Sequence, residues 1–291
     1  MFVPQLTADG SFTFFSAEFG EAFHSHHGAR QEAQLKFTEP TLGTGLGNTL
    51  PSGLRLLDIC YGLGYNTAAA LATIWAVNPK CYVEVVGLEF NDSVPQAAIA
   101  HHLLNNWSQP IPQILTQLAI EHQVQTNRLS ARLLIGDARV TIRLLQELSF
   151  QADAIFLDPF SPLKCPQLWT VEFLGGVAKC LHSSGILATY SSAAAVRTAL
   201  MAGGLKIGST PPVGRRSPGT VASFFAPLPL LSQPEQEHLL TRAAIPYRDP
   251  QLGDSSELIL HRRQQEQHIS SLEPTSHWRK RTRIRQLPKS P

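Results

Sequence analysis

Short apolar runs alternate with segments of helical composition or spacing between residues 54 and 210. The apolar runs predict strands near residues 54–58, 83–90, 132–137, 152–158, 185–190 and 205–208. The intervening segments predict helices at residues 66–77, 94–107, 140–148, 169–180 and 193–202. This alternation predicts an α/β fold with a mostly parallel, doubly wound sheet and right-handed crossovers. Ligands of such sheets bind at the carboxyl ends of the strands.

The same pattern divides the chain into three parts. We expect an N-terminal extension at residues 1–53, with a short strand at 12–15 and a Gly/Thr-rich loop before the core. The core is expected at residues 54–226, with an inserted helix near 114–124. A polar, partly helical C-terminal extension follows at residues 227–291.

The turn after the first predicted strand is the most informative local feature. Residues 54–66, LRLLDICYGLGYN, read as a buried strand, a glycine turn and a helix N-terminus. An α/β fold approaches nucleotide-like ligands in this way. The dinucleotide fingerprint G-x-G-x-x-G is not met, because Cys60 occupies the position of its first glycine.

Acidic residues end the first four predicted strands. This pattern favours the Rossmann-like fold of methyltransferases dependent on S-adenosylmethionine (SAM), a cofactor without pyrophosphate whose sulfonium cation tolerates nearby carboxylates. We expect Glu89 to bind ribose hydroxyls and Asp137 to bind the adenine amino group, with an N-cap role also open to Asp137. The predicted cofactor-binding residues are Asp58, Tyr61, Gly62, Gly64, Asn66, Glu89, Phe90, Asp137 and Ala138.

The loop after the fourth predicted strand, DPFSP at residues 158–162, supplies the candidate catalytic residue. It resembles the [D/N]-P-P-[F/Y] motif of enzymes that methylate exocyclic amines, although Phe160 takes the second proline position. Methyl transfer depends mainly on alignment of the nucleophile. A protonated amine lacks a lone pair, so Asp158 can orient the amine while its proton leaves.

Composition limits the remaining possibilities. Apolar residues make up 43% of the 291 residues and charged residues 16%, so a substantial core can form. The sequence shows neither a membrane-spanning run nor a signal peptide, and we expect a cytoplasmic protein. The four cysteines are widely spaced and are expected to be reduced. No metal site is expected around His24, His26 and His27, because no acid or cysteine completes a ligand set.

Residues 277–291 carry six Lys or Arg residues and no acid. Such a basic tail is either a solvated, disordered end or an arm that contacts phosphate backbones.

Three segments carry a resemblance to a known family. Residues 58–66 are similar to E-T-G-F-G-T-G-L-N, and DPFSPLKCPQLW at 158–169 is similar to D-G-F-A-P-x-K-N-P-x-x-W. Residues 187–204 are similar to L-A-T-F-T-S-A-x-x-V-R-x-x-L-x-x-A-G. Over about residues 10–225 the chain resembles the methyltransferase half of the MnmC-type bifunctional proteins of tRNA 5-methylaminomethyl-2-thiouridine biosynthesis.

The resemblance implies SAM-dependent N-methylation of a 5-aminomethyl(-2-thio)uridine at the tRNA wobble position, with Asp158 near the substrate amine. It makes tRNA the expected partner; no stable protein partner and no membrane is inferred. The chain has no room for the FAD-dependent oxidase half, so neither FAD nor a metal is expected. The candidate substrate- or RNA-binding residues are Phe160, Lys164, Arg197, Arg215 and Arg216, together with the basic tail. Trp169 is expected to pack the loop against the core.

Two other interpretations remain open from the sequence. A methyltransferase or aminopropyltransferase of the same fold could act on a small amine. A degenerate domain could instead serve as a non-catalytic RNA-binding module, which only the replacement of glycine by Cys60 favours.

Overall fold

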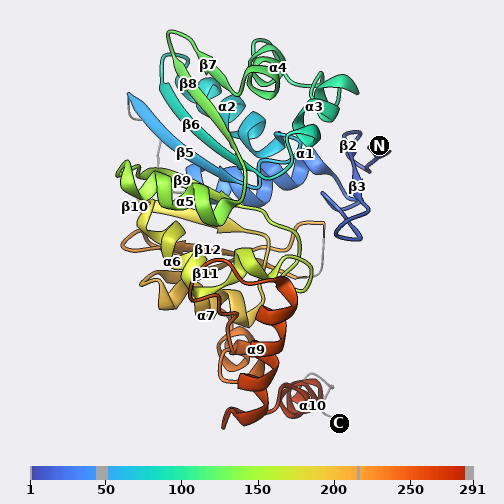
Figure 1. The fold of residues 1–291 in the computed structure, drawn as a ribbon, viewed down its shortest axis with the longest axis vertical. Helices are drawn as coiled ribbons and strands as arrows, with labels where there is room; N and C mark the ends of the chain where they lie inside the picture. Colours follow the sequence, from blue (N-terminus) through green and yellow to red (C-terminus); the bar gives the residue numbers. More distant parts are fainter. Residues whose placement is uncertain (1, 44–51, 215–216, 286–291) are drawn as a thin grey trace, which may run out of the picture.

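The computed structural model describes residues 2–43, 52–214 and 217–285. Its main sheet has eight strands in the order β11-β12-β10-β9-β5-β6-β8-β7 (Figure 1). These strands are β5 (Gly53–Ile59), β6 (Tyr82–Glu89), β7 (Gln123–Gln125), β8 (Leu129–Ile135), β9 (Ala152–Leu157), β10 (Leu181–Thr189), β11 (Lys206–Thr210) and β12 (Gly219–Ser223).

Five adjacent strands of this sheet, from β8 to β10, are parallel. Strand β12 runs antiparallel to β10 and β11, and β7 runs antiparallel to β8. The α/β fold with a mostly parallel sheet is therefore confirmed. The chain builds outward from β5 through β6 to β8, then returns to place β9 on the other side of β5. The reversal leaves a crevice beyond the carboxyl ends of β5 and β9.

Helices cover both faces of the sheet. One face carries α1 (Ala29–Glu32), the π-helical segment η1 (Ala33–Gly43), α2 (Tyr65–Val77), α3 (Ser93–Ala100) and α4 (Ile111–Glu121). The other carries α5 (Ala138–Glu147), α6 (Val171–Lys179) and α7 (Ala194–Ala202).

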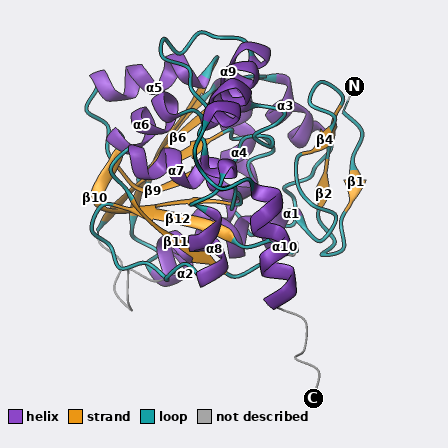
Figure 2. Cartoon of the chain, turned by 90° about the horizontal axis from the view of Figure 1, so that it is seen from below, coloured by secondary structure: helices purple, strands orange, loops and turns teal. Residues whose placement is uncertain are grey.

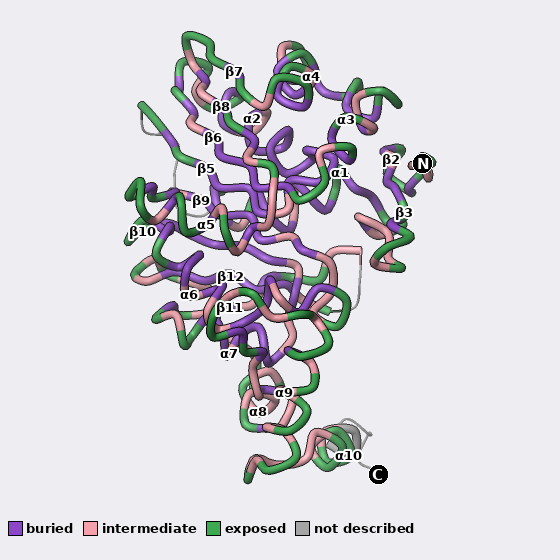
Figure 3. The backbone as a smooth tube through the Cα atoms, in the orientation of Figure 1, coloured by how far each residue is buried: buried purple, intermediate pink, exposed green. Residues whose placement is uncertain are grey.

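Alternation along β5 explains the two layers. Leu54 and Leu56 join one buried cluster, and Leu57 and Ile59 join the other. Successive strand side chains point to opposite faces, so an unbroken apolar run supplies both cores. Figure 3 shows the sheet strands as the most continuously buried part of the chain.

The N-terminal extension forms two small hairpins rather than the single strand expected at residues 12–15. Strand β1 (Gln5–Leu6) pairs with β2 (Phe12–Thr13), and β3 (Phe15–Ser16) pairs with β4 (Glu21–Ala22). The backbone breaks at Phe14, whose side chain is fully buried against the first core cluster.

The C-terminal residues form helices beyond α7: η3 (Arg242–Ala244) is packed against α7, and α8 (Gln233–His238), α9 (Ser256–Ile269) and α10 (Thr275–Arg285) surround it (Figures 1 and 2). The basic tail is thus helical up to Arg285. Trp278 of α10 stacks on His238 of α8, with ring centroids 4.5 Å apart, and Arg281 pairs with Glu273 at 2.6 Å. Within the described ranges, no helix is both long enough and apolar enough to cross a membrane.

Candidate active site

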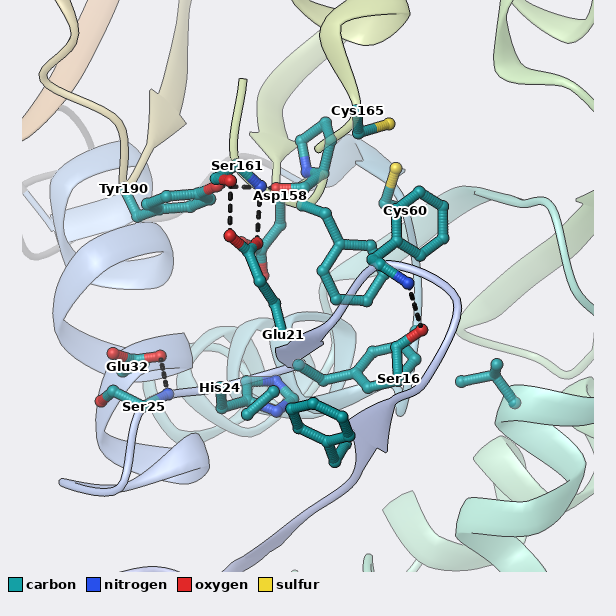
Figure 4. Close-up of a pocket in the computed structure, with 18 of the residues that line it drawn as sticks. Ser16, Glu21, His24, Ser25, Glu32, Cys60, Asp158, Ser161, Cys165 and Tyr190 are labelled. Carbon is teal, nitrogen blue, oxygen red and sulfur yellow. Dashed lines mark hydrogen bonds between the residues drawn. The ribbon is translucent and has the colours of Figure 1, made fainter. Parts of the chain in front are cut away.

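A cavity of about 820 Å³ lies at the carboxyl ends of the central strands, within the size range of small-molecule sites. Its walls come from the segments that follow β5, β6, β9 and β10. Residues 15–27 of the N-terminal extension and part of the α1–η1 helix complete it (Figure 4). We refer to this cavity as the pocket.

The predicted strand, turn and helix at residues 54–66 are present at one wall of the pocket. Cys60, Gly62 and Gly64 all have positive φ, at 66°, 55° and 87°. A Cβ on Gly64 would lie 2.6 Å from the Tyr61 hydroxyl oxygen, so this turn requires glycine. Cys60 takes up the left-handed conformation itself, and the tight turn therefore forms without the first glycine. Gly62 lines the pocket, whereas Tyr61 is buried beneath the loop.

Asp58 and Asn66 lie behind this wall rather than in the pocket lining. The Asp58 carboxylate accepts a hydrogen bond from the Thr67 hydroxyl at 2.7 Å, and burial raises the pKa of Asp58 to about 7. The Asn66 amide donates to the Asp158 carboxylate at 3.1 Å. In both residues the Oδ1 atom is buried without a hydrogen-bond partner. Their predicted contact with the cofactor stays a prediction.

Glu89 joins the end of β6 to the glycine turn. Its carboxylate accepts hydrogen bonds from the N–H groups of Gly62 at 2.8 Å and Asn91 at 2.9 Å. Burial raises the pKa of Glu89. Next to it Phe90 lines the pocket with a largely exposed ring. The position fits the predicted ribose contact, which stays a prediction.

Asp137 and Ala138 do not line the pocket. Asp137 caps α5 by accepting the Arg139 N–H at 2.9 Å, and it pairs with the Arg139 guanidinium at 2.7 Å. Partial burial acts to raise the pKa of Asp137, but the hydrogen bonds from Arg139 outweigh it and lower the pKa overall. Arg139 also pairs with the buried Asp249 at 2.9 Å. The N-cap role is thus present, and the adenine contact stays a prediction.

Asp158 lines the pocket directly after β9. Its backbone N–H donates to the Ile59 carbonyl at 3.1 Å, which fixes the loop to the end of β5. Desolvation inside the pocket wall, and then the nearby charge of Glu32, raise the pKa of Asp158 well above its ordinary value. An acid of this kind can hold or release a proton nearer neutral pH than a free aspartate.

Aromatic contacts hold the rest of the 158–162 loop. The indole N–H of Trp169, which is fully buried, donates to the Phe160 carbonyl at 2.8 Å, so the packing role expected of Trp169 is confirmed. Phe160 lines the pocket and stacks on Phe19, with ring centroids 4.3 Å apart. Phe23 meets the same ring edge-on at 5.0 Å.

Several pocket residues were not found from the sequence. Glu21 accepts hydrogen bonds from the Ser161 N–H at 3.0 Å and the Ser161 hydroxyl at 2.5 Å, tying the N-terminal segment to the loop (Figure 4). The Tyr190 hydroxyl donates to the Pro159 carbonyl at 2.9 Å. Tyr190 carried a usable signal, because it ends a predicted strand. Glu21 carried none beyond its place within residues 10–225, over which the chain resembles the family.

The predicted RNA-facing residues fare differently. Lys164 is exposed, and its Nζ lies 3.7 Å from the point that a Cβ on Gly20 would occupy. Arg215 and Arg216 lie outside the described residues. The prediction for Arg197 is wrong: only 2% of its side chain is exposed, and it pairs with Glu235 at 2.8 Å. Arg197 also donates to the hydroxyl of Thr220, on β12, at 2.9 Å.

The histidine-bearing stretch serves the N-terminal hairpin. His24 is buried, and its ring lies within hydrogen-bonding distance of the Thr13 hydroxyl, at 3.1 Å. In the described part of the chain, no group of three or more His, Cys, Asp or Glu side chains is arranged to hold a metal ion.

Comparison with known proteins identifies the family. Residues 97–224 match the model of an S-adenosyl-L-methionine-dependent methyltransferase family. An uncharacterized protein of Methanocaldococcus jannaschii is 31% identical over 267 residues, which cover 89% of this chain and 70% of that protein. The crystal structure of MnmC2 from Aquifex aeolicus superposes with a TM-score of 0.79 at 34% identity, covering 93% of this chain and 86% of that one. The chain belongs to the MnmC-type methyltransferase family.

This MnmC-type chain is therefore a SAM-dependent methyltransferase. It is also 32% identical over 243 residues to the tRNA 5-methylaminomethyl-2-thiouridine biosynthesis bifunctional protein MnmC of Ralstonia nicotianae. That match covers 76% of this chain and 34% of the relative, so the chain spans about a third of the length of the bifunctional protein.

Proposed function

We propose that this MnmC-type methyltransferase transfers a methyl group from SAM to the primary amine of 5-aminomethyl(-2-thio)uridine at the tRNA wobble position. The product is 5-methylaminomethyl(-2-thio)uridine. The observation that carries the proposal is the position of Asp158, which lines the same pocket as the glycine turn and is bonded to Asn66 at 3.1 Å. Similarity to proteins named for this modification supports the choice of acceptor.

The residues present fit SAM. Gly62, Glu89 and Phe90 offer a backbone approach, an acid and an apolar face in one pocket. The unpartnered Oδ1 atoms of Asp58 and Asn66 lie behind the turn as available acceptors. SAM, when bound, supplies an electrophilic methyl group, and the electron pair of the broken carbon–sulfur bond stays on sulfur.

Asp158 prepares the acceptor. An alkylamine reaches the pocket as an ammonium ion, which has no lone pair. A carboxylate at Asp158 holds the ammonium by a charge-assisted hydrogen bond and takes its proton, leaving a neutral amine with a free electron pair. The raised pKa of Asp158 lies closer to the pKa of the ammonium, which makes the proton transfer from the ammonium to Asp158 less unfavourable. Phe160 and Tyr190 line the same pocket with their aromatic rings.

The charges around the pocket suit cationic ligands. Among the described residues that line it, Glu18, Glu21, Glu32, Glu89 and Asp158 are acids, and Lys36 is the single lysine. This acidity favours both an ammonium group and a sulfonium group. It also keeps open a second candidate, a small polyamine as the acceptor.

Exposed cations supply a surface for the RNA. Lys164 lies beside residues 15–27, which we call the N-terminal cover of the pocket. Arg279 and Lys280 are exposed on α10. Phosphate contacts of this kind position an RNA without reading its sequence and weaken as salt is added. We propose that they hold the tRNA while the wobble nucleotide enters the pocket.

Parallel assays, each with one candidate acceptor, separate tRNA from polyamines. Purified protein with labelled SAM receives bulk tRNA from cells that lack the final wobble methylation, or polyamines at matched amine concentration. The proposal predicts label in tRNA only, and no label in tRNA that already carries the methyl group. Label in polyamines, with none in tRNA, would overturn the proposal and leave the SAM-dependent fold intact.

A further inference from the structure

The pocket contains a buried ion pair. Glu32 and Lys36 lie one helical turn apart, across the junction of α1 and η1, and their charged atoms are 2.7 Å apart. Their side chains are 8% and 5% exposed, yet both line the pocket that contains Asp158. Burying two charges is costly unless their surroundings compensate it. A simple structural contact between the helix and the core would not need them.

The pair is held in one orientation. Lys36 Nζ donates to Glu32 Oε1, and Glu32 Oε2 accepts the backbone N–H of Ser25 at 3.2 Å. Ser25 belongs to the segment that covers the pocket, so Glu32 joins this cover to the helix (Figure 4). Burial acts to raise the pKa of Glu32, but the ammonium of Lys36, the hydrogen bond from Ser25 and the nearby His24 together outweigh it and lower the pKa, so Glu32 stays ionised.

Described side chains from three elements act on the pKa of Asp158. The α1–η1 helix contributes Glu32, which raises its pKa, and Lys36, which lowers it. Strand β5 contributes Asp58, which raises it, and α2 contributes the hydrogen bond of Asn66, which lowers it. Other titratable side chains in the described lining of the pocket include Glu21 and His24 of the cover, Cys60, Glu89 and Tyr190, and His24 acts on Glu32.

We propose that Glu32 and Lys36 are positioning residues for Asp158: Glu32 supplies the negative charge that favours uptake of the acceptor's proton, and Lys36 limits that effect and keeps Glu32 buried in place. This inference rests on the proposed function. In the step, one N–H bond of the ammonium breaks and one O–H bond forms on Asp158. The nitrogen keeps the electron pair. The summed charge of the two groups is zero before the transfer, as ammonium and carboxylate, and zero after it, as amine and carboxylic acid, so no further reactant is required.

Charge-neutral variants of similar shape test the inference through the acid limb of the pH–rate profile. This limb reports the protonation of Asp158, because Asp158 can accept the proton only in its carboxylate form. Glu32→Gln removes an anion and should move the limb to lower pH by about one unit, whereas Lys36→Met should move it to higher pH by a similar amount. The double variant should return it towards the wild-type position. Glu39→Gln, an exposed carboxylate on η1, should leave it unchanged.

A second readout does not require methyl transfer. The carboxyl infrared band of Asp158, identified by its loss in Asp158→Asn, should titrate with the same opposite shifts in protein without tRNA. Shifts in one direction for both variants, or no shift in either, would overturn the inference. Glu32→Gln alone decides the matter if Lys36→Met does not fold. Opposite infrared shifts in a protein that methylates no tRNA would overturn the proposed acceptor and retain the pair's effect on Asp158.

Discussion

Three elements hold Asp158 or act on its carboxyl group. Asn66, near the start of α2, donates a hydrogen bond to it, and the charges of Glu32 and Lys36 act on it from α1–η1. Its backbone is fixed to β5 through the Ile59 carbonyl. The core of the fold therefore fixes the position of the carboxyl group, and side chains of α1–η1 and α2 change its pKa. A loop residue held in this way is a better candidate for chemistry than one free to move.

Replacing Asp158 by alanine should slow methyl transfer at least 100-fold, a typical loss for a general base. The Asp158 carboxylate is hydrogen-bonded to Asn66, at the start of α2, rather than to the glycine turn, so SAM affinity should change little. Single-turnover kinetics and calorimetric SAM titration measure the two effects separately. A wild-type rate in Asp158→Ala would remove the assigned role.

Asp58 should make stability depend on pH. Its pKa is about 7 in the folded protein and about 4 when unfolded, so the folded state binds the extra proton between these values. The stability that Asp58 contributes is complete below pH 4 and is lost as the pH rises to 7, by on the order of 4 kcal/mol. Asp58→Asn mimics the protonated acid, and its unfolding free energy should gain on that of the wild type from pH 5 to pH 8. Denaturant unfolding without SAM measures the gap; a constant gap would contradict the assignment.

Single residues also show what the sequence could and could not reveal. Asp158 and Gly62 were predictable because strand ends and tight turns have local signatures. The burial of Arg197 was not, since its partner Glu235 is 38 positions away in the chain. Cys60 suggested a degenerate loop, but its φ of 66° shows that the side chain is accommodated in the turn.

At the scale of elements, the turn between β5 and α2 offers the sharpest test of the cofactor site. Gly62 has a φ of 55°, and a Cβ there would meet only ordinary contacts, at 3.6 Å. Valine at this φ would cost about 1–2 kcal/mol of stability, and its methyl groups would enter the pocket. We expect Gly62→Val to weaken SAM binding at least tenfold, and Gly62→Ala to weaken it less.

Calorimetric titration of SAM measures both variants, with unfolding curves as the check on folding. Unchanged SAM affinity in a folded Gly62→Val protein would mean that the cofactor binds elsewhere.

The core strands agree with the sequence to within a few residues, because short continuous apolar runs bounded by turn residues favour strands buried on both faces. Strand β12 was missed: it is short, and its place depends on pairing with β10 and β11. The N-terminal hairpins have two-residue strands, and aromatic contacts with Phe160 help to set their position. Contacts of this kind have no local pattern. The position of α10 depends likewise on tertiary contacts: Trp278 stacks on His238 of α8, and Arg281 pairs with Glu273.

At the scale of the whole molecule, the exposed cations of α10 should bind the tRNA backbone. Arg279→Gln with Lys280→Gln should weaken tRNA binding and reduce the slope of log affinity against log salt by about 1.5, the loss of two phosphate contacts. The matched control is Lys80→Gln with Lys206→Gln, which removes two exposed cations at the amino-end edge of the sheet. Binding of labelled tRNA across a salt series measures both. Equal slopes in the two double variants would count against an RNA contact at α10.

The account as a whole depends on the identity of the methylated nucleoside. The direct measurement is to incubate the protein with labelled SAM and tRNA lacking the final wobble methylation, then digest the tRNA and identify the labelled nucleoside by mass spectrometry. The account predicts label in 5-methylaminomethyl uridine or its 2-thio form, and none with Asp158→Ala. Label in a different nucleoside, or no label while SAM still binds, would contradict it.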